Sequence, residues 1–337
     1  MLNRSRNGAR LACLLACCIA VVALPGRATE AATPSAGEVA AADANTSVPF
    51  LGGFLRETRI LYPLQVGEWK AIGEHLYDQP ELGVSVRYVD ATEQDKWIDL
   101  YFYPAGVISA EEFQKGVAME REGLRQAHLQ QGVPAPEIAA LRKFQYDRVM
   151  FDGDKEAASG WSTDFEFTLD GQRKSSAMSV MLEQLYFIKG RFSAPASKFS
   201  RKQTSDALET FMERLLQRLS INSTGACWMP LPIETLKGSQ LPPSGEVQMT
   251  MDDASGTKVY LLQDRVLAAD PTDTMASAMM LLGMEQHGHL FPGCTAPNPE
   301  IPVVPADMRE IHLEYTAPAD ESKPTDAPRL RVRTGAS

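Results

Sequence analysis

Alternation of apolar and polar residues is the feature that most constrains the fold of this chain. The run GVSVRYV places Val84, Val86 and Tyr88 on one face of an extended segment, and WIDLYFY alternates in the same way from Trp97. A period of two residues predicts β-strands with one buried face. The polar link 90–96 is short enough to close the two strands into a hairpin.

Three more strands are predicted further along the chain. They cover residues 141–151, 161–169 and 177–192, and the last is a single long strand. Residues 155–160 are expected to separate the first two, and residues 170–174 to form the turn before the third. Clusters of Gly, Asp and Lys between β-rich runs are typical of such connections.

Two helices are predicted among these strands. The first follows Ser109, because Glu112 three residues later completes a capping box, and it should end near Gln130. The second covers residues 205–220, where a core-facing stripe recurs at helical spacing: Leu208, Phe211, Met212, Leu215 and Leu219. The resulting order, β-β-α-β-β-β-α, indicates an α+β fold in which helices pack on an antiparallel sheet.

One stretch carries a resemblance to a known family. The run YFIKGRFSAP, residues 186–195, resembles the late strand of Mog1/PsbP-like and DcrB-like proteins, where an apolar-Lys-x-Arg strand ends at a proline before a C-terminal helix. The likeness covers the order of elements over about residues 84–220. The whole chain is also similar to uncharacterised exported proteobacterial proteins. This resemblance implies a non-catalytic binding or assembly role, and no catalytic residue carries over from it.

The N-terminus has the pattern of an export signal. Arg4, Arg6 and Arg10 precede an apolar run of 14 residues, 11–24, and small residues follow at a cleavage site after Ala28. The run is shorter than the roughly 20 residues that a membrane span needs. We therefore predict a cleaved signal peptide at residues 1–28 and a periplasmic or secreted protein. The alternative is a lipoprotein anchored to the membrane at Cys17.

Charge narrows the choice of partners. Loss of residues 1–28 removes four arginines and no acids, which takes the net charge from −10 to −14. Such an acidic surface argues against nucleic acid and anionic lipid. The expected partner is an unknown protein or small ligand, and no cofactor is predicted.

Cysteine usage predicts one disulfide. The predicted mature chain keeps only Cys227 and Cys294, and two cysteines in an oxidising compartment most simply pair with each other. The bridge would tie together a proline-rich region that has few strong elements of its own.

The same patterns divide the chain into segments. Residues 29–47 lack large apolar side chains and are predicted to be a disordered linker. The main α+β domain is placed at 48–221, a small C-terminal domain at 222–316 and a disordered tail at 317–337. In the small domain we predict a hairpin of strands 246–251 and 258–263, a helix that starts at Asp270-Pro271, and a strand at 309–315.

Residues 285–294, EQHGHLFPGC, are the most chemically suggestive stretch. His287 and His289 are candidate metal ligands, and Cys294 could be a nucleophile only if it were not paired. The favoured interpretation is the end of a helix, with His287 in its last turn and Gly288 as the C′ residue. Cys294 is then half of the disulfide.

A second candidate site is a surface for a partner. Five side chains from two predicted strands make it up: Trp97, Tyr101, Tyr103, Lys189 and Arg191. If a helix covers them, they form a second core layer instead.

Standard catalytic motifs are not found in the sequence, including G-x-S-x-G, H-E-x-x-H and the P-loop. The favoured hypothesis is therefore an exported, non-catalytic cell-envelope protein with a binding or accessory role. One alternative is an extracytoplasmic hydrolase that gathers dispersed residues around His75 or His128. The other is a metal-binding protein that uses His287 and His289.

Overall fold

An eight-stranded antiparallel sheet forms the centre of the molecule, in the order β2-β3-β4-β5-β9-β8-β7-β6. Its strands are β2 (Gln65–Val66), β3 (Trp69–Leu76), β4 (Val84–Asp90), β5 (Trp97–Pro104), β6 (Arg142–Val149), β7 (Lys155–Leu169), β8 (Gln172–Glu183) and β9 (Tyr186–Pro195). The computed structural model describes residues 54–90, 92–93, 95–130, 134–149, 155–237, 241–243, 245–300, 303–315 and 329–334. The predicted signal peptide and linker lie outside these residues.

The predicted hairpin is confirmed: β4 pairs with β5, and the apolar residues of the alternating pattern lie on its buried face. Val84, Val86 and Tyr88 are fully buried on one face, together with three residues of β5 (Ile98, Leu100 and Phe102). A short 3₁₀ helix, Pro80–Leu82, precedes β4.

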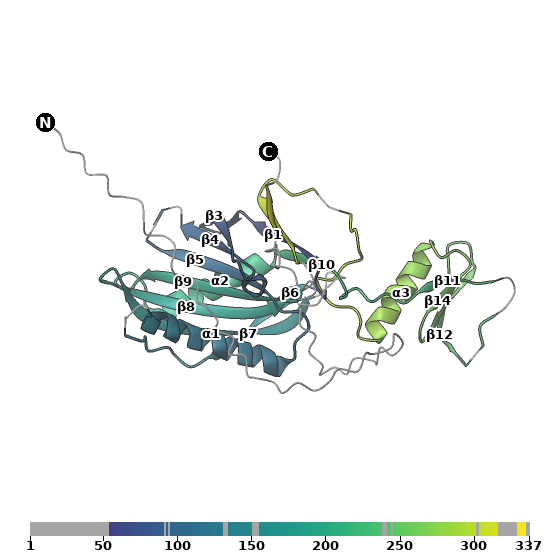
Figure 1. The fold of residues 1–337 in the computed structure, drawn as a ribbon, viewed down its shortest axis with the longest axis horizontal. Helices are drawn as coiled ribbons and strands as arrows, with labels where there is room; N and C mark the ends of the chain where they lie inside the picture. The colour runs from purple at the N-terminus through teal and green to yellow at the C-terminus, as the bar shows by residue number, and fades with distance from the viewer. Residues whose placement is uncertain are drawn as a thin grey trace, which may run out of the picture.

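One helix covers each face of the central sheet (Figure 1). Helix α1 (Ala110–Gln130) begins at the predicted capping box, where the Glu112 N–H donates to Ser109 Oγ at 3.2 Å and the Ser109 N–H donates to Glu112 Oε2 at 2.9 Å. Its residues Phe113, Val117 and Leu124 pack on β7 and β8.

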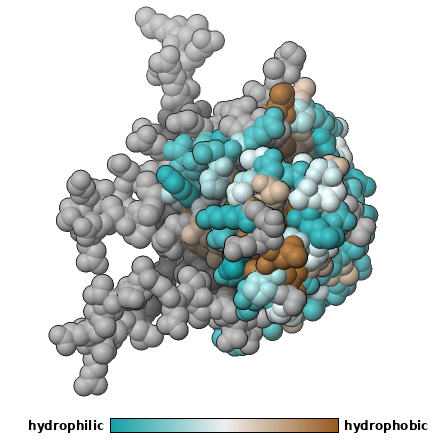
Figure 2. All heavy atoms as spheres, turned by 90° about the vertical axis from the view of Figure 1, so that its right-hand side faces the viewer, coloured by the Kyte–Doolittle hydropathy of each residue, from teal (hydrophilic) through white to brown (hydrophobic). Residues whose placement is uncertain are grey.

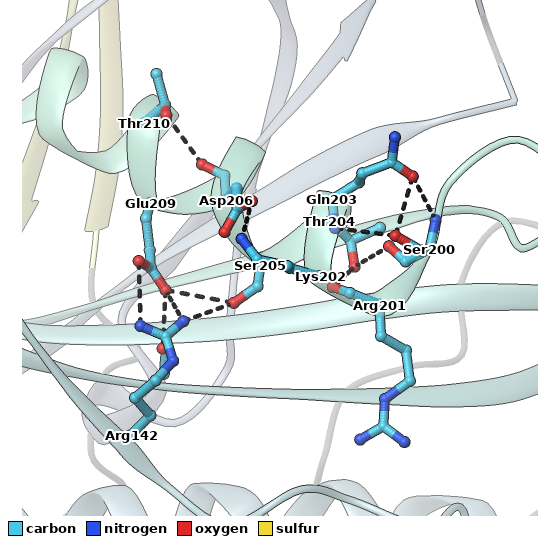
Figure 3. Close-up of polar contacts among 11 residues, drawn as sticks. Arg142, Ser200, Arg201, Lys202, Gln203, Thr204, Ser205, Asp206, Glu209 and Thr210 are labelled. Carbon is cyan, nitrogen blue, oxygen red and sulfur yellow. Dashed lines mark hydrogen bonds and ion pairs between the residues drawn. The ribbon is translucent and has the colours of Figure 1, made fainter.

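Helix α2 (Arg201–Leu216) lies on the opposite face and packs on β7, β8 and β9. It begins four residues earlier than predicted, because Ser200 and Gln203 form a capping box of their own (Figure 3). The predicted stripe faces inward: Leu208, Phe211, Met212 and Leu215 are buried.

Two predicted strand boundaries are wrong. Residues 155–160 do not separate two strands, because they pair with the end of β6 from Val149↔Lys155 onward and so belong to β7. The predicted strand 177–192 is two strands, since the chain reverses at Gln184 and Leu185, which have φ of 50° and 70°. The α+β class is confirmed, with one more strand than predicted over residues 84–216 and three strands over residues 57–76 that the predicted order lacks.

A second sheet, in the order β10-β1-β15-β16, packs on the same side as α2. Its strands are β1 (Glu57–Pro63), β10 (Ser220–Thr224), β15 (Met308–Glu314) and β16 (Arg329–Thr334). The hydroxyl groups of Tyr186 and Tyr315 meet at 2.7 Å between the two sheets.

The predicted end of the second helix at Ser220 is wrong. Helix α2 ends at Leu216, and Ser220 is already the first residue of β10, where it pairs with Leu61 of β1.

The C-terminal segment contributes to this second sheet. The strand predicted at 309–315 is confirmed as β15, and it pairs along its length with β1 of the predicted main domain. Strand β16 lies in the predicted disordered tail and pairs with β15, so residues 329–334 correct that expectation. Residues 317–328 lie outside the described part of the chain.

A third, smaller sheet and α3 form a unit at one end of the molecule (Figure 1). The sheet has the order β11-β14-β13-β12, and its elements are β11 (Ile233–Thr235), β12 (Val247–Asp252), β13 (Lys258–Leu262), β14 (Val266–Ala268) and α3 (Thr274–Gln286). The predicted hairpin is confirmed as β12 and β13. A separate core includes Leu261, Val266 and Met279. From this end, apolar side chains form small patches among hydrophilic ones (Figure 2).

Helix α3 begins later than predicted. Asp270 does not cap it, because its carboxylate accepts the Thr272 N–H at 2.8 Å and so closes a turn. Asp273 is the N-cap, and its Oδ1 accepts the Met275 N–H at 2.7 Å. Among the described residues, no helix is long and apolar enough to cross a membrane.

Candidate functional site

The predicted partner surface lies on one face of β5 and β9, next to α1. Strand pairing places Tyr101 opposite Lys189 and Asp99 opposite Arg191. Tyr101, Lys189 and Arg191 are only 9%, 6% and 7% exposed. Of the two alternatives, an open surface and a second core layer, the second describes these three residues, because α1 covers this part of the sheet.

Lys189 ties α1 to the sheet. Its Nζ donates to Glu120 Oε2 of α1 at 2.7 Å and lies 4.4 Å from the ring centroid of Tyr101 and 4.9 Å from that of Tyr103. Burial raises the pKa of Tyr101 well above its usual range, so its phenol stays neutral. Cation–π contacts with an ion pair stabilise a buried lysine.

Trp97 is half-buried between two cations. Arg87 and Lys174 lie 5.8 Å and 5.5 Å from its ring centroid. Its Nε1–H donates to Asp99 Oδ2 at 3.1 Å, and Arg87 forms a bidentate pair with the same carboxylate at 2.6 and 3.0 Å. The ring and its polar edge are therefore engaged within the protein.

A groove between β6 and α2 has a different character. It has a volume of about 300 Å³ and contains no cationic side chain in its lining. The lining residues are Phe144, Gln145 and Tyr146 of β6, and Asp206, Glu209, Thr210 and Glu213 of α2. Residues three and four apart share a helix face, so α2 turns three acids toward β6.

Glu209 is held in place at one end of this groove (Figure 3). Its carboxylate pairs with Arg142 and accepts hydrogen bonds from Ser162 Oγ at 2.9 Å and Ser205 Oγ at 3.3 Å. Arg142 also donates to Ser205 Oγ at 3.0 Å. Glu209 is therefore fixed by an ion pair and two hydroxyl groups, and Arg142 offsets its charge.

These acids were missed in the sequence. Positions 206, 209 and 213 have the i, i+3, i+7 spacing of one helix face, on the side of α2 that the core stripe leaves polar. This spacing alone could have predicted an acidic face on the helix. The sequence did not indicate that the start of β6 would lie beside that face.

A second cavity of about 570 Å³ lies near the β7–β8 turn. Its charged side chains neutralise one another: Arg173 pairs with Glu166, and Lys198 lies 3.1 Å from Asp95. It therefore offers no excess charge to a ligand.

His287 and His289 lie at the end of α3, as the helix-stop interpretation predicts. The His287 N–H donates to the Gly283 carbonyl at 3.0 Å, and Gly288 follows with φ of 66°. The two rings meet edge to face at 6.0 Å. In the described part of the chain, no group of three or more His, Cys, Asp or Glu side chains could hold a metal ion.

The other two candidate histidines, His75 and His128, line neither of the two cavities. His75 is exposed on β3, with its ring 4.7 Å from that of Tyr77. His128 is buried in the last turn of α1, and its Nδ1 lies 2.7 Å from the Leu124 carbonyl. Neither arrangement gathers the residues that the hydrolase hypothesis needs.

The predicted disulfide is confirmed between Cys227 and Cys294, whose Cα atoms are 6.0 Å apart. Both cysteines are buried, and the backbones beside them are also joined: the Ser223 N–H donates to the Gly293 carbonyl at 2.6 Å. A disulfide is typical of proteins that fold in an oxidising compartment.

Comparison of the chain with models of known protein families and with curated proteins finds no match. The resemblance to Mog1/PsbP-like and DcrB-like proteins thus stays a prediction.

Proposed function

We propose that this chain is an exported, non-catalytic binding protein of the cell envelope, and that it holds a partner in the groove between β6 and α2. The observation that carries the proposal is the joining of a free strand edge to a wall of acidic side chains. Lys202 pairs with Asp206 at the exposed surface and Arg142 pairs with Glu209, whereas no ion pair joins Glu213 to another described residue. Among the described strands, β6 is hydrogen-bonded only to β7, so its other edge faces outward. Asp206, Glu209 and Glu213 stand beside it.

The kind of partner follows from this combination. A free strand edge accepts another extended segment through main-chain hydrogen bonds. The acidic wall favours basic side chains on that segment, and charge complementarity sets which partners are accepted. We therefore expect a protein with an exposed, extended, basic stretch.

Location outside the cytoplasm is part of the same proposal. The buried disulfide supports it, because such bonds rarely persist in the reducing cytoplasm. The basic and apolar N-terminal pattern supports export through a cleaved signal.

Site-specific crosslinking in cells tests the proposal. A photo-crosslinking residue at Gln145, which lines the groove, should yield a defined adduct. The same residue at the exposed Gln114 of α1 is the matched control and should not. The double variant Asp206→Asn, Glu213→Gln should lose the adduct, because it removes charge without changing side-chain size.

Equal adducts at both positions, or background alone, would count against a partner in this groove. A second control is the double variant Glu81→Gln, Glu137→Gln, which removes the same charge from exposed positions outside the groove. It should leave the adduct at Gln145 unchanged.

A further inference from the structure

Arg191 is a buried cation whose side-chain donors make no hydrogen bond to the described residues. It lies on β9 beneath α1 and is 7% exposed. Its guanidinium carbon is 5.6 Å and 5.5 Å from the ring centroids of Phe165 and Phe167. No hydrogen bond or ion pair joins it to another residue in the described part of the chain, and its Nε is buried without a partner.

Two acids of this region, Asp99 of β5 and Glu120 of α1, form ion pairs with other residues. Asp99 lies directly opposite in the strand register, yet its carboxylate forms the bidentate pair with Arg87 and accepts the Trp97 Nε1–H. Glu120 of α1 receives the ammonium group of Lys189. Neither carboxylate neutralises Arg191.

This face of the sheet is therefore locally positive in an acidic protein. Strands β4, β8 and β9 contribute four cations to it, Arg87, Lys174, Lys189 and Arg191, against Asp99 of β5 and Glu120 of α1, while the whole chain has a net charge of −10. Lys174 is also buried, at 5% exposure, and within the described residues its Nζ donates to the main-chain carbonyl of Asp95 alone, at 3.3 Å.

A guanidinium group presents five N–H donors in a planar fork, and burying those donors without acceptors is unfavourable. Stacking on two rings compensates for part of the charge, but it does not satisfy the donors. The groups that match this fork are oxyanions, which accept two parallel hydrogen bonds from it.

We propose that Arg191 is the anchor of a binding site for a small oxyanion, a carboxylate or a phosphate, between α1 and the sheet. Arg191 supplies the paired hydrogen bonds, and Lys174, on the same face of β8, adds a second positive charge. This site is separate from the groove of the proposed function, because α1 and α2 lie on opposite faces of the sheet (Figure 1).

Titration of the full chain with sodium acetate, phosphate and sulfate, at ionic strength held constant with chloride, tests the site. Calorimetry and the thermal midpoint should both show saturable binding of at least one anion. Comparing the affinities for acetate and phosphate shows whether the site prefers a planar or a tetrahedral anion. Arg191→Met should bind at least about 30-fold more weakly, because the remaining interactions lack the charged donor. Arg191→Lys should fall between the two, since it keeps the charge and loses the fork.

Arg125→Met is the matched control, because Arg125 is an arginine of α1 paired with Glu122 near the surface. It should bind as the wild type does. The groove variant Asp206→Asn, Glu213→Gln should also leave anion affinity unchanged, so that failure of one proposal is distinguishable from failure of the other. If Arg191→Met does not fold, Lys174→Met should still weaken binding. No saturable binding to the wild type, or equal binding to Arg191→Met (an adventitious ion only), overturns the proposal.

Discussion

Cys227 and Cys294 join the two ends of the segment that carries α3 and the smallest sheet. The bond spans 67 residues, and the chain leaves the second sheet just before Cys227 and returns toward it after Cys294. The Thr295 N–H also donates to the Ser223 carbonyl at 2.8 Å. The disulfide therefore closes the base of this segment.

The double variant Cys227→Ser, Cys294→Ser should lower the free energy of unfolding. Opening a 67-residue loop restores chain entropy to the unfolded state, for which the loop-entropy relation gives about 4 kcal/mol. Urea denaturation of the oxidised protein measures the loss. Reduced wild type should match the variant, and a loss below about 1 kcal/mol would contradict this account.

Gly190→Ala should destabilise the contact between β9 and α2. A Cβ at Gly190 would come within 2.7 Å of Met212 Sδ and 2.9 Å of Leu208 Cδ1, so these two buried side chains must repack, at a cost of up to about 1–3 kcal/mol. Gly123→Ala in α1 is the control, because a Cβ there meets nothing within 4 Å, and a better helix former should stabilise by up to about 1 kcal/mol. Equal thermal midpoints for the two variants would argue against this packing.

Lys189→Met should cost about 3–5 kcal/mol, because it leaves the carboxylate of Glu120 beneath α1 without its ammonium partner. The double variant Lys189→Met, Glu120→Leu should recover much of that loss, since both charges of the pair are then removed. Denaturation of the two single variants and the double variant gives the coupling between the residues. Additive losses would show that the pair does not act as a unit.

Protonation of the Asp90 carboxylate should lower the free energy of unfolding in acid. Hydrogen bonds from Lys96 Nζ and from Thr92 hold the pKa of this carboxyl well below its usual range. Since the folded pKa lies below the unfolded value of about 3.9, the stabilisation is present above that pH and is lost as pH falls toward the folded pKa. Asp90→Asn should flatten the slope of unfolding free energy against pH between about pH 5 and 2. Parallel curves for wild type and variant would refute the assignment.

Local patterns predicted most of the regular structure. The alternation in β4 and β5 and the capping box at Ser109 appear as expected, because they depend on neighbours within a few residues. The turn at Gln184 and Leu185 was missed because neither residue is a usual turn former. It is held by distant contacts: Gln184 Oε1 accepts the Ile221 N–H at 2.5 Å, and the Leu185 carbonyl accepts the Ala105 N–H at 2.8 Å.

The sequence by itself determined the α+β class, the core-facing stripes and the cysteine pair, because periodicity and the number of cysteines left for pairing require no knowledge of distant contacts. Only the tertiary structure decided which polar side chains are covered and which are open. Lys189 and Arg191 became buried because α1 crosses their strand, whereas Asp206 and Glu213 line a groove because β6 ends the sheet beside α2. Burial of a charged side chain depends on elements far away in the chain, and the chain's local pattern does not contain that information.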